Sequence, residues 1–405
     1  MTSQSVRIVA HSMSRPDWES ISGIGHYEQR AGVVVREQDW LVVSTDVEPG
    51  YLDYRRDLLG LRSRALQTKA PGANLAQRII NDDTVLGKLR EVVASGALLD
   101  TFIVGPDEER LAESLGVNLL GSASSSHYFG SKTGFRAVAQ KTGVSVAPGI
   151  EGLQNLSELL LACDQLFDTG SERIVVKGDQ GASSTENLVL SKNDLDWKNK
   201  VQSLFQSFHV KSCVVESWID DVTVSPSIHF IILDSGVVPL MGPWQQVLVG
   251  ENREYAGIMH PPKLTLDVQE KLRMQGFYLA SKYFAEGYRG YVGYDAIVRE
   301  NSDIVWVECN ARKGGPYYPM RFAENMGLEG QVVWGMDLCH EQIRTMRFSQ
   351  LLEAFGDILF DEQIRDQGGV VLYNPGLMEI GKIQTIIIAS DDQRAQYLWR
   401  RLRAV

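Results

Sequence analysis

The sequence predicts an α/β protein of two or three domains that opens with a parallel sheet. The chain has 405 residues, and at about 150 residues per domain this length accommodates two or three. Hydrophobic residues make up 44% of the chain and charged residues 22%, which is ordinary for a folded globular protein. Through residues 6–120, apolar runs typical of strands alternate with helical segments. That alternation indicates an open parallel sheet covered by helices.

The elements of this first sheet follow one another closely. Runs of apolar and β-branched residues predict strands at 6–10, 32–35, 40–44, 99–104 and 117–120. Apolar residues recur at helical spacing over 74–95, and a shorter polar helix is expected over 107–115. A glycine-containing loop, 22–26, follows the first strand. No GxGxxG sequence occurs there, so dinucleotide binding by this part of the chain is not indicated.

The rest of the chain mixes helices with pairs of strands. Helices are expected over 131–143, 155–167 and 267–286, and a last one begins at Asp391. The helix over 267–286 starts with Asp267 and Glu270, which resemble a capping box. Strands are expected at 173–177, 188–190, 212–216, 224–233, 237–240, 290–299, 303–310, 370–373 and 383–389.

The charge and the termini exclude several kinds of partner. Forty basic and 51 acidic residues give a formal net charge of −11, which disfavours non-specific binding to nucleic acid or to an anionic membrane. The N-terminus lacks the pattern of a signal peptide, and the apolar runs are far shorter than a membrane span. We therefore expect a cytoplasmic protein. The four cysteines form no CxxC pair, so neither a zinc site nor a disulfide framework is expected.

The first candidate binding element is a strand that ends in a lysine and continues into a loop of small residues, over 173–184. Lys177 at the end of that strand can place its ammonium group over a phosphate. The loop has no bulky side chains, so its backbone N–H groups can approach an anion closely. An ordinary hairpin with an exposed lysine is the alternative interpretation.

The second candidate element lies where another predicted strand ends, over 214–220. Glu216, Trp218 and Ile219 supply an acid, an aromatic ring and an aliphatic side chain in quick succession. Such a set can accept a hydrogen bond from an adenine amino group and cover the faces of the ring. A plain strand exit is the alternative.

The third candidate element places oxygen donors on two neighbouring strands. Asp295 lies on the first strand, and Glu308 and Asn310 lie two residues apart on the second, so both point to one face. Hard oxygen ligands on one face suit Mg²⁺, which also binds substrate phosphates. Arg312 lies on the same face if the strand continues, where it can meet a phosphoryl oxygen. A solvated face of an antiparallel pair is the alternative, although the flanking residues are strongly apolar.

In order and spacing, these three elements and Lys132 resemble the motifs of the ATP-grasp superfamily of carboxylate–amine ligases, over about residues 124–330. The resemblance implies that ATP and Mg²⁺ are the cofactors. It implies that ATP is bound by Lys132, Lys177, Gly181, Ser183, Ser184, Glu216 and the backbone of Ile219. It further implies that Asp295, Glu308 and Asn310 hold Mg²⁺, and that Lys177 and Arg312 are the catalytic cations.

Within the superfamily, the chain looks most like the pheganomycin-type peptide ligases, because residues 369–397 resemble their small C-terminal part. The resemblance implies a pre-ATP-grasp domain with an open parallel sheet over 1–123. An ATP-grasp core of two α+β subdomains follows over 124–340, and a small C-terminal α/β piece over 341–405.

The reaction implied by this resemblance is the joining of a carboxylate to an amine. Phosphorylation by ATP would convert the carboxylate of an amino acid or small peptide into an acyl phosphate, which an amine attacks to form an amide, releasing ADP and phosphate. Loading of an amino acid onto a carrier-protein thiol, nucleotide binding without catalysis and a biotin-carboxylase-like activity are the alternatives. A homodimer stays open. The candidates for the acceptor pocket are residues 313–318, His229, Tyr255, His260 and Arg321, with the loop 22–26 at its border.

Overall fold

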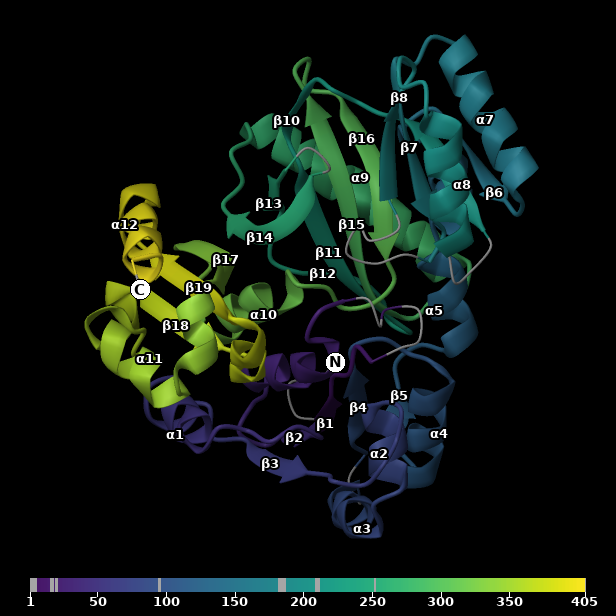
Figure 1. Cartoon of the computed structure of the whole chain (residues 1–405). Coiled ribbons are helices and arrows are strands. Elements are labelled where there is room, and N and C mark those ends of the chain that lie inside the picture. Colours follow the sequence, from purple (N-terminus) through teal and green to yellow (C-terminus); the bar gives the residue numbers. More distant parts are fainter. Residues whose placement is uncertain are drawn as a thin grey trace.

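The computed structural model describes residues 6–14, 18, 21–93, 96–180, 187–207, 212–250 and 253–404 (Figure 1). Three sheets organise these residues: a five-stranded parallel sheet, a four-stranded antiparallel sheet and a ten-stranded antiparallel sheet. No helix in these ranges is both long enough and apolar enough to cross a membrane.

The first sheet confirms the expected open parallel architecture. Its strands, in the spatial order β3-β2-β1-β4-β5, are β3 (Arg64–Gln67), β2 (Trp40–Val43), β1 (Arg7–Ala10), β4 (Leu98–Thr101) and β5 (Asn118–Leu119). All four neighbouring pairs are parallel. The helices between these strands are α1 (Pro49–Asp57), α2 (Leu75–Ile80), α3 (Asp83–Val92) and α4 (Pro106–Leu115).

Three local expectations for this region were wrong. The single helix over 74–95 is two helices, because the Asp82 side chain accepts a hydrogen bond from the backbone N–H of Val85 and starts a second one. Residues 32–35 form no strand: they close the 3₁₀ helix η2 (Ile24–Val33) and the turn after it. Their valines are buried, and a short buried apolar run does not distinguish helix from strand. The strand expected over 99–104 ends at Thr101.

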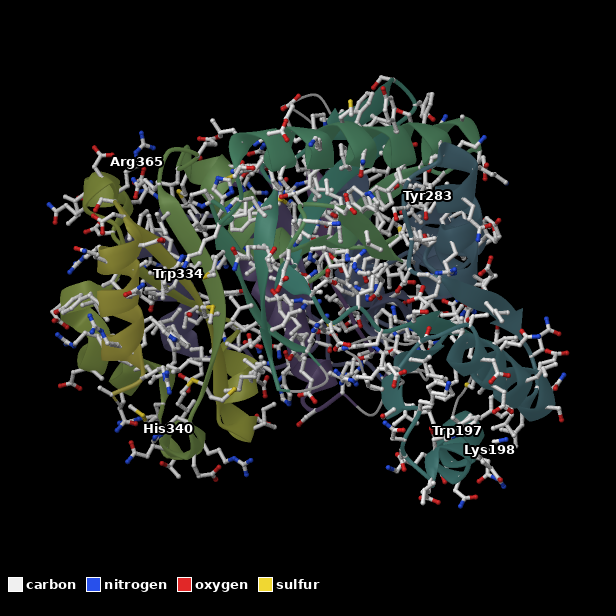
Figure 2. The ribbon with its side chains drawn as sticks, turned by 90° about the horizontal axis from the view of Figure 1, so that it is seen from above. Trp197, Lys198, Tyr283, Trp334, His340 and Arg365 are labelled. Carbon is white, nitrogen blue, oxygen red and sulfur yellow. The ribbon has the colours of Figure 1, made fainter. Side chains whose placement is uncertain are left out.

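The four-stranded sheet has the order β6-β9-β7-β8 and forms a small lobe with its helices. Its strands are β6 (Gly149–Leu153), β9 (Cys213–Ser217), β7 (Arg173–Gly178) and β8 (Asn187–Ser191), and the helices α7 (Leu156–Asp168) and α8 (Trp197–Ser207) cover one face. Figure 2 shows Trp197 and Lys198 of α8 at the end of the molecule opposite His340. Two further helices, α5 (Ala123–Phe129) and α6 (Lys132–Thr142), precede this lobe.

The large sheet carries the rest of the chain. Its strands are β10 (Val222–Val224), β11 (Pro226–Leu233), β12 (Gly236–Pro239), β13 (Trp244–Val249), β14 (Glu254–His260), β15 (Gly290–Arg299), β16 (Ile304–Asn310), β17 (Val332–Cys339), β18 (Gly369–Tyr373) and β19 (Lys382–Ala389). Its helices are α9 (Leu266–Ala285), α10 (Tyr317–Met326), α11 (Phe348–Phe355) and α12 (Asp392–Leu402). The helix α9 is capped by Thr265, whose side chain accepts from the N–H of Val268, so the expected start at Asp267 was wrong.

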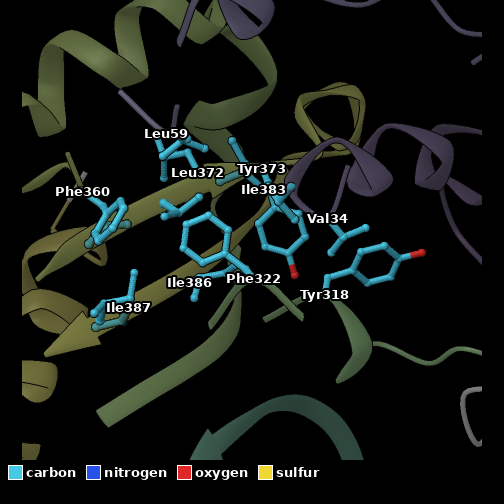
Figure 3. Packing of buried hydrophobic residues seen from close by; sticks show 14 of the residues in the cluster. Val34, Leu59, Tyr318, Phe322, Phe360, Leu372, Tyr373, Ile383, Ile386 and Ile387 are labelled. Carbon is cyan, nitrogen blue, oxygen red and sulfur yellow. The ribbon is translucent and has the colours of Figure 1, made fainter. Parts of the chain in front are cut away.

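One hydrophobic core joins the beginning of the chain to its end. Val34 and Leu59 from the first region pack in the same cluster as Phe322 of α10 and Leu372 and Ile386 of the C-terminal strands (Figure 3). Because β17 pairs with β19 along its whole length, the C-terminal strands extend the large sheet. The first sheet and the large sheet are therefore held together by shared packing.

Candidate active site

A cavity of about 290 Å³ lies between the four-stranded sheet and the strands β11, β13, β15 and β16. Within the described ranges, every residue predicted to bind ATP, to hold Mg²⁺ or to act as a catalytic cation lines it: Lys132, Lys177, Glu216, Ile219, Asp295, Glu308, Asn310 and Arg312. These residues come from α6, β7, β9 and its exit, and β15, β16 and its exit. The predicted binding residues Gly181, Ser183 and Ser184 lie outside the described residues.

The oxygen donors come together because β15 and β16 pair with Asp295 opposite Glu308 and Gly293 opposite Asn310. The Nδ2 atom of Asn310 donates to Oδ2 of Asp295 at 3.1 Å. From β11, the Ser227 hydroxyl donates to Oδ1 of Asp295 at 2.6 Å. Burial and the neighbouring charge of Glu308 raise the pKa of Asp295 to about 7. Two half-buried carboxylates are thus held on neighbouring strands.

This donor set fits a hard divalent cation. Carboxylate oxygens of Asp295 and Glu308 and the amide oxygen of Asn310 are the ligand types that Mg²⁺ takes, with water and substrate phosphates completing its shell. A cation there would relieve the repulsion that raises the pKa of Asp295. Within the described residues, no three or more His, Cys, Asp and Glu side chains lie together in a way that could hold a metal ion. A cation at this site would therefore also need Asn310, water and phosphate oxygens as ligands.

The other wall of the cavity carries a matched set of charges. Glu216 is only 3% exposed, and its two oxygens accept hydrogen bonds from Arg136 and from Lys177, each at 2.6 Å. Burial alone would raise the pKa of Glu216, but Lys177 and Arg136 lower it below its ordinary value. Arg136 also donates to Glu151 at 2.9 Å. The ammonium group of Lys177 is therefore held at the cavity wall by a buried carboxylate.

Lys132 is placed by the way in which α6 begins. The Ser131 side chain caps the helix by accepting from the N–H of Gly134, and Asp179 accepts from the backbone N–H of Thr133 at 2.8 Å. Asp179 also accepts from the Ser212 hydroxyl at 3.1 Å. The start of the loop that follows β7 is thereby tied to the first turn of α6. Lys132 and Lys177 consequently face the same cavity.

The exit of β9 forms an aromatic and cationic edge of the cavity. Arg253 places its guanidinium carbon 4.5 Å from the ring centre of Trp218, and Arg173 approaches the same ring at 5.2 Å. Arg253 also donates to the carbonyl of Ile219 at 3.1 Å. Trp218, Ile219 and Arg253 all line the cavity, so this edge has the flat apolar surface that a nucleobase needs.

The structure places the candidate acceptor residues in different parts of the molecule. His229, Tyr255, Gly314, Gly315 and Pro316 line the cavity, whereas Lys313 and Arg321 line a small buried cavity behind it. His260 lies away from both and bonds the Pro243 carbonyl. His229 is fully enclosed, and burial lowers its pKa to about 3, so its ring is neutral at physiological pH. The loop 22–26 lines none of these cavities.

Another cavity, of about 350 Å³, adjoins the first. It differs from the small buried cavity lined by Lys313 and Arg321, and we call it the second cavity. Glu308, Asn310 and Arg312 line both cavities and so form a shared wall. The other side of the second cavity is made by Trp18, the end of the β4 segment and the starts of α4 and α5. A molecule in this space would contact the same oxygen donors as a molecule in the first cavity.

Sequence reasoning missed two residues that position the site. Arg136 lies four residues after Lys132, so both fall on one face of a helix, and that spacing could have identified it. Ser227 bonds Asp295 only because β11 pairs with β15 in the register that places the two residues opposite each other. A long-range register of this kind leaves no local signal in the sequence.

Two family models match the chain in this order: the pre-ATP-grasp domain at residues 28–117 and the ATP-grasp domain at residues 157–316. The chain therefore contains a pre-ATP-grasp domain followed by an ATP-grasp domain. It is 26% identical over 321 residues to the L-propargylglycine–L-glutamate ligase of Streptantibioticus cattleyicolor. That match covers 70% of this chain and 64% of the relative, and so spans less than two thirds of the relative's length.

Solved structures share the whole architecture. The ADP complex of N5-carboxyaminoimidazole ribonucleotide synthetase (purK) matches with a TM-score of 0.63 at 14% identity, over 98% of this chain and 96% of that one. Biotin carboxylase from Campylobacter jejuni matches with a TM-score of 0.62 at 12% identity, over 96% and 89% of the two chains. N5-carboxyaminoimidazole synthetase from Staphylococcus aureus, complexed with ADP, matches with a TM-score of 0.60 at 12% identity, over 98% and 96%. At these identities the similarity establishes the fold.

Proposed function

We propose that this chain is an ATP-dependent ligase that joins the carboxylate of an amino acid or small peptide to an amine, with release of ADP and phosphate. The observation that carries the proposal is the cavity that brings two lysines, Arg312 and the Asp295–Glu308–Asn310 set to one place. The ATP-grasp domain and the similarity to an amino-acid ligase support it. A cytoplasmic location and small-molecule substrates are part of the same proposal.

The chain's own groups fit the charge changes of such a reaction. Bound ATP with Mg²⁺ would supply the phosphoryl group that turns a carboxylate into an acyl phosphate. Asp295, Glu308 and Asn310 would hold the cation, and Lys132 and Lys177 would neutralise phosphate oxygens. Arg312 lies on the wall shared by the two cavities, where it can stabilise the charge that develops between nucleotide and carboxylate.

Adenine fits the edge made by the exit of β9. Trp218 and Ile219 offer flat and aliphatic surfaces there, and Glu216 is fixed beside them by Lys177 and Arg136. The Ser227 hydroxyl lies 3.0 Å from Nε2 of His229 in this cavity. Burial lowers the pKa of His229 to about 3, which makes it a weak base. An acyl phosphate route needs no nucleophile from the protein. The amine would approach from the second cavity, where it meets the acyl carbon across Arg312.

The test is a screen of amino acids and amines for stimulated ADP release, with mass spectrometry of the product. We expect ADP and phosphate only when a carboxylate and an amine are both present. Release of AMP and pyrophosphate would contradict the proposal, and so would nucleotide binding without any product.

A matched pair of variants tests the assigned residues. Glu308→Gln should lower kcat by roughly a thousandfold, because it removes a charge that the phosphoryl transfer needs. Glu300→Gln, at an exposed position in the turn after β15, should leave kcat unchanged. Full activity of Glu308→Gln would remove the metal assignment.

A further inference from the structure

The side of the first cavity that the large sheet forms changes from charged to neutral across the sheet. Its strands lie in the spatial order β16-β15-β11-β13-β14. The carboxylates that line the cavity lie on β16 and β15, whereas the strands β11, β13 and β14 contribute five neutral side chains. We call these five the neutral wall: Ser227, His229, Gln246, Leu248 and Tyr255. His229 belongs to it because burial lowers the pKa of its ring to about 3.

Leu248 and Tyr255 form the apolar end of the neutral wall. They lie directly opposite each other on β13 and β14, and side chains in such a pair point to one face of a sheet. Leu248 is half-buried and Tyr255 is 40% exposed, so both offer surface to a molecule in the cavity. Arg253 also lines the cavity from the turn between these strands, but its guanidinium lies against Trp218 and donates to the backbone beyond it.

The two ends of the neutral wall are tied to the charged groups of the site. At one end the Ser227 hydroxyl donates to Asp295. At the other end Tyr255 meets the segment after β16: a methyl group on Gly315 would lie 3.1 Å from the Tyr255 hydroxyl. Arg312 precedes Gly315 by three residues and lines the same cavity. The neutral wall therefore spans the space between the oxygen donors and the segment that carries Arg312.

We propose that the neutral wall binds the side chain of the carboxylate substrate, which is then an amino acid or small peptide with an uncharged side chain next to the reacting carboxylate. This rests on the proposed ligase function and names its acid class. The reacting carboxylate must meet the phosphoryl group beside the cation, and the donors proposed for that cation line the same cavity as the wall. A charged side chain against Leu248 and Tyr255 would lose its hydration without gaining a partner.

The experiment compares Leu248→Lys with Val249→Lys in the full chain. Val249 is the next residue on β13 and is 50% exposed, and neighbouring side chains on a strand point to opposite faces. Its variant therefore adds the same charge outside the cavity. The readout is kcat/KM for ADP release with each of the twenty common amino acids as the acid, free and as its glycyl dipeptide, together with the amine found by the screen.

The wild type should prefer uncharged acids to acids of similar size with a charged side chain, such as glutamine to glutamate, by roughly tenfold or more. That is the smallest effect expected for a charge left without a partner in a site that excludes water. Leu248→Lys should reduce this preference over aspartate and glutamate by roughly tenfold, because it supplies a counter-charge. Val249→Lys should leave the preference unchanged.

Two further variants separate specificity from folding. Leu248→Gln keeps the wall neutral and should keep the preference for uncharged acids within about threefold of the wild type. The Tm of every variant is measured without ligand. Tyr255→Lys places the charge on the opposite strand and serves the same test if Leu248→Lys does not fold.

Two results would overturn the proposal: a wild type that uses a charged acid as well as any uncharged one, or a folded Leu248→Lys with an unchanged preference. A wild type that releases no ADP with any acid and amine would refute the ligase function separately. Thermal shifts by the same acids, with ADP and Mg²⁺ present, then test the neutral wall without turnover. Shifts by uncharged acids that Leu248→Lys loses support the proposal, and equal shifts by charged and uncharged acids, or none, overturn it.

Discussion

Two groups of charged residues each line a cavity together with Arg312, and they differ in how well their charges are matched. In the first, Arg7 pairs with Asp39 at 2.6 Å and with Asp100 at 2.9 Å, and Lys313 pairs with Asp100 at 2.5 Å. Burial alone would raise the pKa of Asp100, but Lys313, His11 and Arg7 hold it well below its usual range. This group joins the first sheet to the segment after β16.

The second group is the Asp295–Glu308 pair, which has no such match. Arg312 and the Ser227 hydroxyl lower the pKa of Asp295, yet burial and Glu308 raise it further, to about 7. This difference separates charged groups that stabilise the fold from charged groups that bind a ligand. A group whose charges are balanced within the chain holds two regions together, whereas excess charge of one sign needs a counter-ion from outside.

Breaking the matched group should have the largest effect on stability. Asp100→Asn leaves Lys313 and Arg7 facing a neutral amide, so the free energy of unfolding should fall by about 3–5 kcal/mol. Urea unfolding measures it, with Asp53→Asn at an exposed position of α1 as the control. A loss no larger than that of the control would show that the first group does not join the two regions.

Glu28 is a second carboxylate for which the structure gives no ion pair within the described residues, and it is buried. Its effect on stability should therefore depend on pH. It accepts hydrogen bonds from the N–H and hydroxyl of Ser44, but burial raises its pKa to about 7. The folded protein then holds a proton that the unfolded chain releases near pH 4.5, so the stability from this group is present below that pH and is lost as pH rises toward 7.

Glu28→Gln keeps an acceptor for Ser44 and removes the titration. Relative to the wild type, this variant should gain at most about 3 kcal/mol of unfolding free energy between pH 4.5 and pH 7.5. Urea unfolding at both pH values measures the difference. A constant difference across that range would contradict the raised pKa.

Removing one charge of the Asp295–Glu308 pair should change the free energy of unfolding least, and should raise it. Glu308→Gln removes the charge that faces Asp295, so the ligand-free protein should become more stable by about 1 kcal/mol. The expected rise in Tm accompanies the loss of activity. A fall in Tm would show that Glu308 stabilises the fold and that the repulsion is compensated elsewhere.

The sequence predicted the parallel sheet and the strand pair β15–β16 well, because alternating elements and apolar runs are local patterns. It also predicted residues that meet in one cavity, since the order of the motifs carries that information. It missed the break at Asp82 and the helical role of 32–35, where side-chain capping and burial decide the structure. It also missed Ser227, which meets Asp295 only through the pairing of two strands far apart in the chain.

The most direct test of the difference between the two groups is the rise in Tm caused by ADP, measured with Mg²⁺ and with EDTA. A ligand at about 100 times its Kd stabilises a protein by roughly 2.7 kcal/mol. In the wild type the rise should be clearly larger with Mg²⁺, and Glu308→Gln should make the two values equal, while Asp100→Asn keeps the Mg²⁺-dependent difference. Equal rises with and without Mg²⁺ in the wild type, or a Mg²⁺-dependent rise that survives in Glu308→Gln, would contradict the assignment of the unmatched carboxylates to the cation.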